Sequence, residues 1–249
     1  MSAKGVALIL GAGPGLGSAL VRRFRAASFT VAAASRTLAS KAAAAPGGGE
    51  FGADAGVKLF DVDASDEGSV AALVQRIESD LGPISFCCFN VGGAQSFGDR
   101  KPVTETELSS LEANWKAIAV GGFIAAKHVG KVMAARGAGT LVFTGATAAL
   151  RGSALFAALA APKFALRALT QSAARELAPQ GVHVVHVIVD GVINVPGLGD
   201  KWPAAKEMAK VPGTLLEPDD MSQTYLALHE QPRSAWTYEL ELRPMREKY

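Results

Sequence analysis

The chain has 249 residues, a formal net charge of +2, and Lys and Arg residues that are scattered rather than clustered. This length suits one α/β domain, and the scattered charge excludes a basic face for nucleic acid. The adjacent cysteines Cys87 and Cys88 predict buried free thiols in a reducing compartment rather than a disulfide. The apolar run 5–10 is too short for a signal peptide or a membrane span, so we expect a cytoplasmic protein without membrane contact.

Short apolar runs alternate with segments of helical spacing along the whole chain. In chain order, the first half predicts a strand at 6–10, a helix at 18–27, strands at 30–34 and 57–60, a helix that opens at Ser65, a strand at 84–89 and a long helix at 108–135. Residues 39–56, rich in Ala and Gly, predict no clear element. The second half predicts a strand at 140–144, a helix at 155–177, a strand at 183–189, a proline-containing loop with a short helix near 196–212, a helix at 219–229 and a last strand at 235–242. This alternation predicts an α/β fold: a single doubly wound parallel-sheet (Rossmann) domain over residues 1–249, with about seven strands and helices on both faces.

The sequence Gly-Ala-Gly-Pro-Gly-Leu-Gly occupies residues 11–17, between the first predicted strand and the first predicted helix. Gly11 permits a tight turn, Gly15 lets the backbone approach a pyrophosphate, and Gly17 lets the helix pack closely against the strand. The start of the helix adds free N–H groups and the positive end of its dipole. This context favours a dinucleotide site over a plain glycine-rich turn, and residues 1–135 are then mainly the cofactor half. The predicted site residues in this loop are Gly11, Gly13, Gly15, Leu16 and Gly17.

The second predicted strand ends in Ser35, Arg36 and Thr37. An acidic residue here would accept the ribose hydroxyls of NAD(H), and the sequence has none at these positions. Arg36 offers a forked cation that suits a phosphate, and the two hydroxyls are further donors. The three residues therefore predict a preference for NADP(H) over NAD(H), the alternative being that Arg36 is only a solvated surface charge.

Beyond this loop, the chain resembles the short-chain dehydrogenase/reductase family over essentially its whole length. The glycines at 11, 15 and 17 match the family's GxxxGxG loop. The resemblance implies further cofactor contacts. Asp61 and Val62 match the pair that holds the adenine, and Asn90, Val91 and Gly92 match a turn like the family's Asn-Ala-Gly. Lys163 matches the active-site lysine, and Gly191 and Ile193 lie in the segment beside the nicotinamide. Asp190 stands where the family usually has proline, and Val195 where it usually has threonine. The resemblance also implies catalytic roles for Lys163 and Asn114.

Two departures from the family bear on the chemistry. Leu159 stands four residues before Lys163, where the family has the tyrosine that acts as general acid or base, and Ala146 stands where it has a substrate-binding serine. A missing general acid typically costs about 10² to 10⁴ in rate. A substitute donor is one interpretation, and the candidates are Thr144, Thr147, Ser153 and a water held by Lys163 and Asn114. In the other interpretation, Lys163 is retained only to bind the cofactor.

These observations leave two main hypotheses. The first is an NADP(H)-dependent short-chain oxidoreductase that acts on an unknown small apolar carbonyl or alcohol with an altered proton donor. The alternative is a catalytically silent NADP(H)-binding sensor or partner subunit; a structural subunit without cofactor is a weaker reading, given the intact glycine loop. The family resemblance implies a homodimer or homotetramer, and an active-site and substrate-lid half at 136–249 with the lid at 196–212. Leu198, Trp202 and Met208 suggest an apolar lining of this lid, the alternative being that they serve only packing. No residue spacing favours a metal, because His183 and His186 face opposite sides of a predicted strand.

Overall fold

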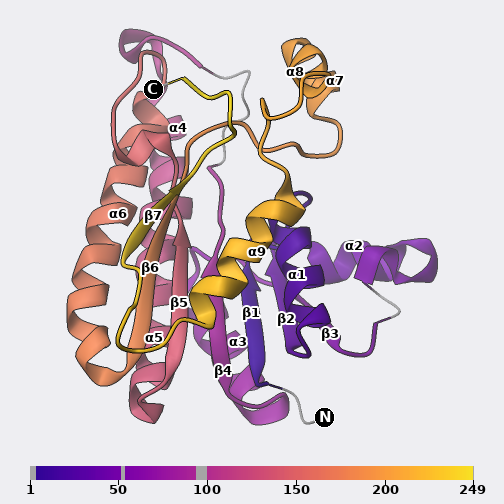
Figure 1. Ribbon diagram of the computed structural model, residues 1–249, viewed down its shortest axis with the longest axis vertical. Coiled ribbons are helices and arrows are strands. Elements are labelled where there is room, and N and C mark those ends of the chain that lie inside the picture. Colours follow the sequence, from indigo (N-terminus) through magenta and orange to yellow (C-terminus); the bar gives the residue numbers. More distant parts are fainter. Residues whose placement is uncertain (1–3, 52–53, 94–99, 249) are drawn as a thin grey trace.

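Residues 4–51, 54–93 and 100–248 are described by a computed structural model, and their strands form one seven-stranded sheet (Figure 1). The strand order is β3-β2-β1-β4-β5-β6-β7, and every pair of neighbours is parallel. The strands are β1 (Val6–Leu10), β2 (Thr30–Ser35), β3 (Val57–Asp61), β4 (Ile84–Phe89), β5 (Gly139–Thr144), β6 (Val182–Val189) and β7 (Glu239–Leu242). The doubly wound fold predicted from the sequence is confirmed. The order reverses between β1 and β4, and ligands bind at such a switch point in sheets of this kind.

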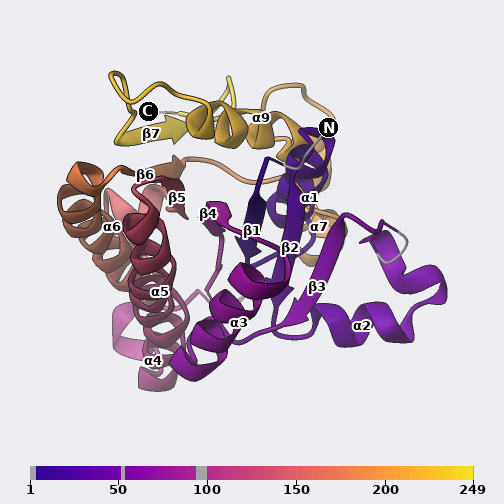
Figure 2. The same cartoon turned by 90° about the horizontal axis from the view of Figure 1, so that it is seen from below.

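Helices cover both faces of the sheet, as the view from below shows (Figure 2). One face packs against α3, α5 and α6, and the other against α1 and α9. The helices are α1 (Leu16–Ala26), α2 (Leu38–Ala44), α3 (Glu67–Asp80), α4 (Leu108–Asn114), α5 (Gly121–Arg136), α6 (Ala157–Leu177), α7 (Leu198–Lys201), α8 (Pro203–Ala209) and α9 (Pro218–His229). The short helices α7 and α8 project beyond the sheet in Figure 1.

Strand β1 shows why the central strands are continuous apolar runs. All five of its residues are buried. Val6, Leu8 and Leu10 pack on the side of α3, α5 and α6, while Ala7 and Ile9 pack on the side of α1 and α9. A strand covered on both faces has no polar side to present to water. The adjacent thiols of Cys87 and Cys88 in β4 are buried and free for the same reason, and burial raises the pKa of both.

The sequence prediction misses one helix. Residues 38–44 form α2, within the region where we expected no clear element. Its first amides, from Ala39 and Ser40, donate to the carboxylate of Asp61 at the end of β3. The acceptor at this helix start therefore comes from about twenty residues away, so no local sequence signal marks it.

The predicted helix 108–135 is continuous in space but not uniform. Residues Trp115–Val120 form a π-helical turn between α4 and α5, directly after Asn114. Such turns occur frequently at functional sites. The whole run Leu108–Arg136 is long and apolar enough to cross a membrane by length and composition, and half of its most apolar window is buried inside the domain. A core-facing helix meets the same criteria.

Other boundaries differ by a few residues. The helix predicted from Leu155 begins at Ala157, because Leu155 has a positive φ of 69°. The last strand covers only Glu239–Leu242 of the predicted 235–242. Two short helices, α7 and α8, form where one was expected. None of these differences changes the order of the elements.

Candidate functional site

The glycine loop connects β1 to α1 at the switch point of the sheet. Gly11 has a φ of 94°, and a side chain there would collide with the backbone of Asn90. Asn90 in turn donates from Nδ2 to the Gly11 carbonyl at 3.1 Å. A methyl group on Gly17 would lie 2.7 Å from the Gly11 oxygen, so the start of α1 packs directly on the loop. These close contacts explain why residues 11 and 17 are glycines, even without a bound ligand.

The start of α1 has the donors that a pyrophosphate requires. The amides of Ser18 and Ala19 bind the carbonyls of Gly13 and Gly15. Among the described residues, the amides of Leu16 and Gly17 have no backbone acceptor, which leaves them available to an anion. Gly13 has no atom within 4 Å of the position a side chain would take. A dinucleotide phosphate fits this open cradle of glycines.

The other end of the predicted nucleotide site lies beyond β2. Ser35 ends β2 and is half-buried, whereas Arg36 and Thr37 are exposed. The nearby Asp63 has a lowered pKa, chiefly through its hydrogen bonds with Ser65 and also through the charges of Lys116 and Arg36. The charge of Arg36 therefore acts on the Asp63 carboxylate, while the Arg36 side chain itself is exposed to solvent.

Asp61 ends β3 and Val62 follows it, at the place where the resemblance puts the adenine. Val62 is buried, with its amide bound to the Ser35 carbonyl at 2.9 Å. The Asp61 carboxylate accepts from the amides of Ala39 and Ser40 and from the Ser40 hydroxyl, and these bonds hold its pKa below the ordinary value. An adenine amino group would have to share a carboxylate that already starts α2.

The turn after β4 lies beside Asn114 and Leu159, two positions that the family resemblance singled out. A side chain at Gly93 would collide with Oδ1 of Asn114 and would touch Leu159. Asn114 is fully buried, and its Nδ2 donates to the Ser110 carbonyl at 3.0 Å. Val91 is half-buried against the core, while Gly92 is exposed. The Asn114 amide and the Leu159 side chain therefore both lie against Gly93.

Lys163 is a buried cation at the carboxyl end of β5. Its Nζ donates to the Thr144 carbonyl at 2.9 Å. Burial lowers the pKa of Lys163 from 10.5 to about 8. Pro162, just before it, lies within α6 and is buried, so the lysine stands where the helix lacks one backbone donor. At neutral pH this ammonium is close to its point of deprotonation, which suits a proton-transfer group.

At the positions of the missing tyrosine and serine, the side chains have no group that can donate or accept a proton. Leu159 packs on the core beside Gly93, and Ala146 is half-buried after β5. Among the substitute donors, Thr144 hydrogen-bonds the Tyr225 hydroxyl at 3.0 Å, on the face covered by α9 and away from Lys163. Ser153 is exposed. The Thr144 hydroxyl is therefore not placed to replace the phenol.

Thr147 is tied into a polar cluster that the sequence did not predict. Its hydroxyl donates to the carboxylate of Asp190, which is buried at the end of β6 and lies 3.4 Å from an Arg243 nitrogen. The sequence showed Asp190 only as a substitute for proline. Its partner Arg243 directly follows β7, so the pair becomes apparent only when that last strand lies beside β6.

The segment after β6 turns over the glycine loop. Gly191 has a φ of 151° and packs on Pro244, and Ile193 forms a bridge with Leu216. Val195 lies so close to Gly15 that a side chain there would meet its Cγ1 at 2.5 Å. The residues Gly191 to Val195 thus connect the end of the sheet to the nucleotide loop.

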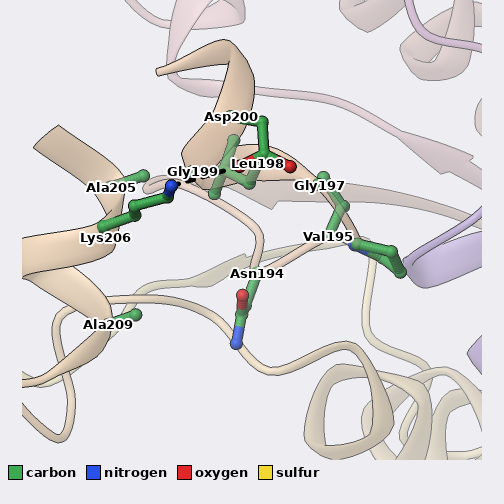
Figure 3. A pocket seen from close by; sticks show the side chains of 10 residues that line it. Asn194, Val195, Gly197, Leu198, Gly199, Asp200, Ala205, Lys206 and Ala209 are labelled. Carbon is green, nitrogen blue, oxygen red and sulfur yellow. Dashed lines mark ion pairs between the residues drawn. The ribbon is translucent and has the colours of Figure 1, made fainter. Parts of the chain in front are cut away.

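The predicted lid residues mostly contact one another. Trp202 and Met208 pack on a small cluster that includes Leu198 and Ala205. A pocket of about 480 Å³ opens beside them (Figure 3), and Lys206 and Asp200 form an ion pair of 3.2 Å there. The pocket lining runs from Asn194 to Asp200, with Ala205, Lys206 and Ala209. The apolar residues of the lid are accounted for by packing within the lid.

Comparisons with known proteins agree with this architecture. Residues 5–205 match the family model described as short chain dehydrogenase. A short-chain dehydrogenase/reductase of Hericium erinaceus is 33% identical over 199 residues, which cover 79% of this chain and 77% of that protein. The crystal structure of a short-chain dehydrogenase from Rhodopseudomonas palustris is 33% identical, with a TM-score of 0.76 over 96% of this chain and 98% of that one. ElxO, solved with NADP bound, has the same fold, with a TM-score of 0.83 at 20% identity over 97% of each chain. The chain therefore belongs to the short-chain dehydrogenase/reductase family.

Proposed function

We propose that this protein is an NADP(H)-dependent oxidoreductase that interconverts a small carbonyl compound and its alcohol, with Lys163 rather than a tyrosine as the ionisable group. The observation that carries the proposal is the buried ammonium of Lys163, with a pKa of about 8, at the same sheet edge as the open glycine cradle. A scaffold that only bound other proteins would gain nothing from a costly buried charge at this place.

The residues of the chain divide the work between binding and proton transfer. The nicotinamide, when bound, supplies or accepts the hydride. The glycine loop and the free amides of Leu16 and Gly17 would hold the phosphates, and Gly191 and Ile193 would lie beside the ring. Lys163 would give a proton to the developing alkoxide in the reductive direction and take one from the alcohol in the oxidative direction. Buried Asn114 would fix the turn that ends in Gly93 beside this site.

The preference for NADP(H) rests on Arg36. The end of β2 carries no carboxylate that would repel a 2′-phosphate, and the exposed guanidinium can form a bidentate pair with one. Asp63, whose carboxylate feels the positive charge of Arg36, already accepts hydrogen bonds from the amide and the hydroxyl of Ser65.

The decisive experiment measures dissociation constants for NADPH and NADH by calorimetry. NADPH should bind at least about tenfold more tightly, a difference of about 1.4 kcal/mol. In the Arg36→Leu variant the two constants should converge, while Lys41→Leu, which removes an exposed cation from α2, should leave both unchanged. Equal affinities in the unaltered protein would refute the NADP(H) preference, and no binding of either cofactor would refute the oxidoreductase itself.

A second candidate is a silent NADP(H)-binding sensor or partner subunit. It is motivated by Leu159 and Ala146, which leave the positions of the tyrosine and serine without a proton donor. This candidate predicts tight NADPH binding with no turnover on a broad carbonyl panel, and activity that appears only in the double variant Leu159→Tyr with Ala146→Ser. Turnover by the unaltered chain that equals that of the double variant would exclude it.

A further inference from the structure

A second pocket lies at the edge of the sheet opposite the glycine loop. Its volume is about 590 Å³, within the range of pockets that hold small molecules. Gly5, Pro83, Gly139 and Gly181 line it, and they lie at or just before the starts of β1, β4, β5 and β6. Because these strands are parallel, their starts share the edge where β1 begins in Figure 1, whereas the glycine loop follows the far end of β1. The pocket is therefore separate from the nucleotide site.

Positive charge dominates the lining of this pocket. Lys4, Arg136 and Arg233 line it, and no acidic side chain does so among the described residues. Lys4 pairs with Glu230 at 3.6 Å and Arg136 pairs with Glu78 at 2.8 Å, so two of the cations are compensated by carboxylates outside the lining. Arg233 has no carboxylate partner in the part of the chain that the structure describes. The pocket therefore carries an uncompensated positive charge, which suits an anion.

Backbone carbonyls orient the two guanidinium groups. Nη2 of Arg233 donates to the Gly137 carbonyl at 2.7 Å, and Nη2 of Arg136 donates to the Ile84 carbonyl at 2.6 Å. The bond to Gly137 uses one N–H group of Arg233, and residues 4–51, 54–93 and 100–248 offer no acceptor to the others. Those N–H groups are available to a carboxylate, which can accept two parallel bonds from a guanidinium.

An aromatic wall lies beside these cations. Trp236 lines the pocket, and its ring stacks on that of buried His183, with centroids 4.9 Å apart and planes within 4° of parallel. This contact fixes the orientation of the indole. Leu81 and Pro83 add apolar surface to the lining. A flat ring would gain more from such a wall than a saturated one of similar size.

His229, at the end of α9, also lines the pocket. Its Nδ1 lies 2.9 Å from the hydroxyl of Thr140, another lining residue. Burial lowers the pKa of His229, the charge of Glu230 directly after it opposes this change, and those of Lys4 before β1 and His183 on β6 add to it. The ring is therefore neutral at pH 7. A carboxylate bound nearby would favour the protonated ring, which makes His229 a reporter of an anion in the pocket.

We propose that this pocket is a binding site for a small aromatic carboxylate. The carboxylate pairs with the guanidinium of Arg233, and the ring lies against Trp236. Neither the glycine loop nor Lys163 takes part, so the site does not depend on the oxidoreductase function proposed above.

The first test measures the binding of 2-naphthoate to the full chain by calorimetry. We expect a dissociation constant below about 1 mM, and the same value when NADPH is present in excess. Two analogues separate the contributions of charge and ring. Naphthylmethanol lacks the negative charge and cyclohexanecarboxylate lacks the aromatic ring, and each should bind at least about tenfold more weakly.

The second test uses a matched pair of arginine variants. Arg233→Met should weaken the binding of 2-naphthoate at least about tenfold, because the carboxylate loses its forked donor. Arg175→Met is the control, since Arg175 is also exposed and also donates to a backbone carbonyl, that of Gln171 at 3.0 Å, but lies outside the lining. It should leave binding unchanged. Both arginines are exposed, so neither change should prevent folding.

The third test places the ligand in the pocket by NMR. The chain has four histidines, so the ring signals of His229 can be assigned by their loss in His229→Gln. Bound 2-naphthoate should raise the titration midpoint of His229 by at least about half a pH unit. The signals of His128, which contacts Glu67 outside the pocket, should not move.

The proposal is overturned if 2-naphthoate does not bind at concentrations up to about 10 mM, or if the uncharged analogue binds equally well. Unchanged affinity in Arg233→Met, or an unchanged His229 midpoint, would overturn it as well. Displacement of 2-naphthoate by NADPH would show that the anion occupies the nucleotide site instead. Failure of the protein to bind NADPH would contradict the oxidoreductase function alone, because none of these measurements requires the cofactor to bind.

Discussion

Lys163 makes the stability of this protein depend on pH. The difference between a pKa of 10.5 and about 8 corresponds to roughly 3 kcal/mol in favour of the amine. The folded state binds this proton less tightly than the unfolded chain. The free-energy cost of burying the charged ammonium is therefore fully present below pH 8 and vanishes as the pH rises to 10.5. Lys163→Met removes it but deprives the Thr144 carbonyl of its donor, a loss of about 1 kcal/mol.

We therefore expect Lys163→Met to raise the free energy of unfolding by about 2 kcal/mol at pH 7, measured by urea titration. The gain should shrink as the pH rises from 8 towards 10.5. Lys131→Met, at an exposed site on α5, serves as the matched control and should show neither effect. A gain that stays constant over this pH range would contradict the burial argument.

At the residue scale, the family resemblance indicates which groups meet but not what else binds them. Asn114 and Leu159, which the family resemblance assigns to one active site, both lie against Gly93. The bonds from α2 to Asp61 were not predictable, because they join a helix to a strand end that is remote in sequence. The pairing of His186 with Glu239 was not predictable for the same reason, since only strand pairing brings these two residues together.

The connection from β1 to α1 can be tested with two glycines in the same loop. A methyl group on Gly17 would overlap the backbone of Gly11 and Ala12, whereas one on Gly13 would meet nothing within 4 Å. We expect Gly17→Ala to lower the free energy of unfolding by about 1–3 kcal/mol and to weaken NADPH binding. Gly13→Ala should leave stability unchanged. If the phosphates run over the open cradle, it should still weaken NADPH binding at least about tenfold.

Thermal unfolding and calorimetric titration separate these two effects. Gly13→Ala matters most, because its loss of affinity cannot be ascribed to loss of fold. Full NADPH affinity in that variant would place the phosphates elsewhere.

At the scale of elements, the strands were predictable because burial on both faces leaves only apolar residues. The π-helical turn at Trp115–Val120 was not, because its residues keep ordinary helical spacing.

The whole fold follows from the alternation of strands and helices. Parallel neighbours need crossover helices, and right-handed crossovers leave few possible strand orders. The glycine loop after β1 indicates the switch point, which the order β3-β2-β1-β4-β5-β6-β7 confirms. What the topology does not determine is which contacts the last strand makes near the site. These come from single side chains, Glu239 on β7 and Arg243 directly after it.

At the scale of the assembly, we expect a dimer or tetramer formed through the helices α4, α5 and α6, which lie together in Figure 2. Four large apolar side chains are between 42% and 66% exposed there: Leu108 on α4, Trp115 in the π-helical turn, Phe123 on α5 and Phe164 on α6. Water around such a surface favours its burial against a second copy. Phe123→Glu should reduce the mass measured by light scattering to that of one chain. Val211→Glu, an exposed apolar position outside these helices, should not. A monomeric unaltered protein, or an oligomer that survives Phe123→Glu, would show that this surface is not the interface.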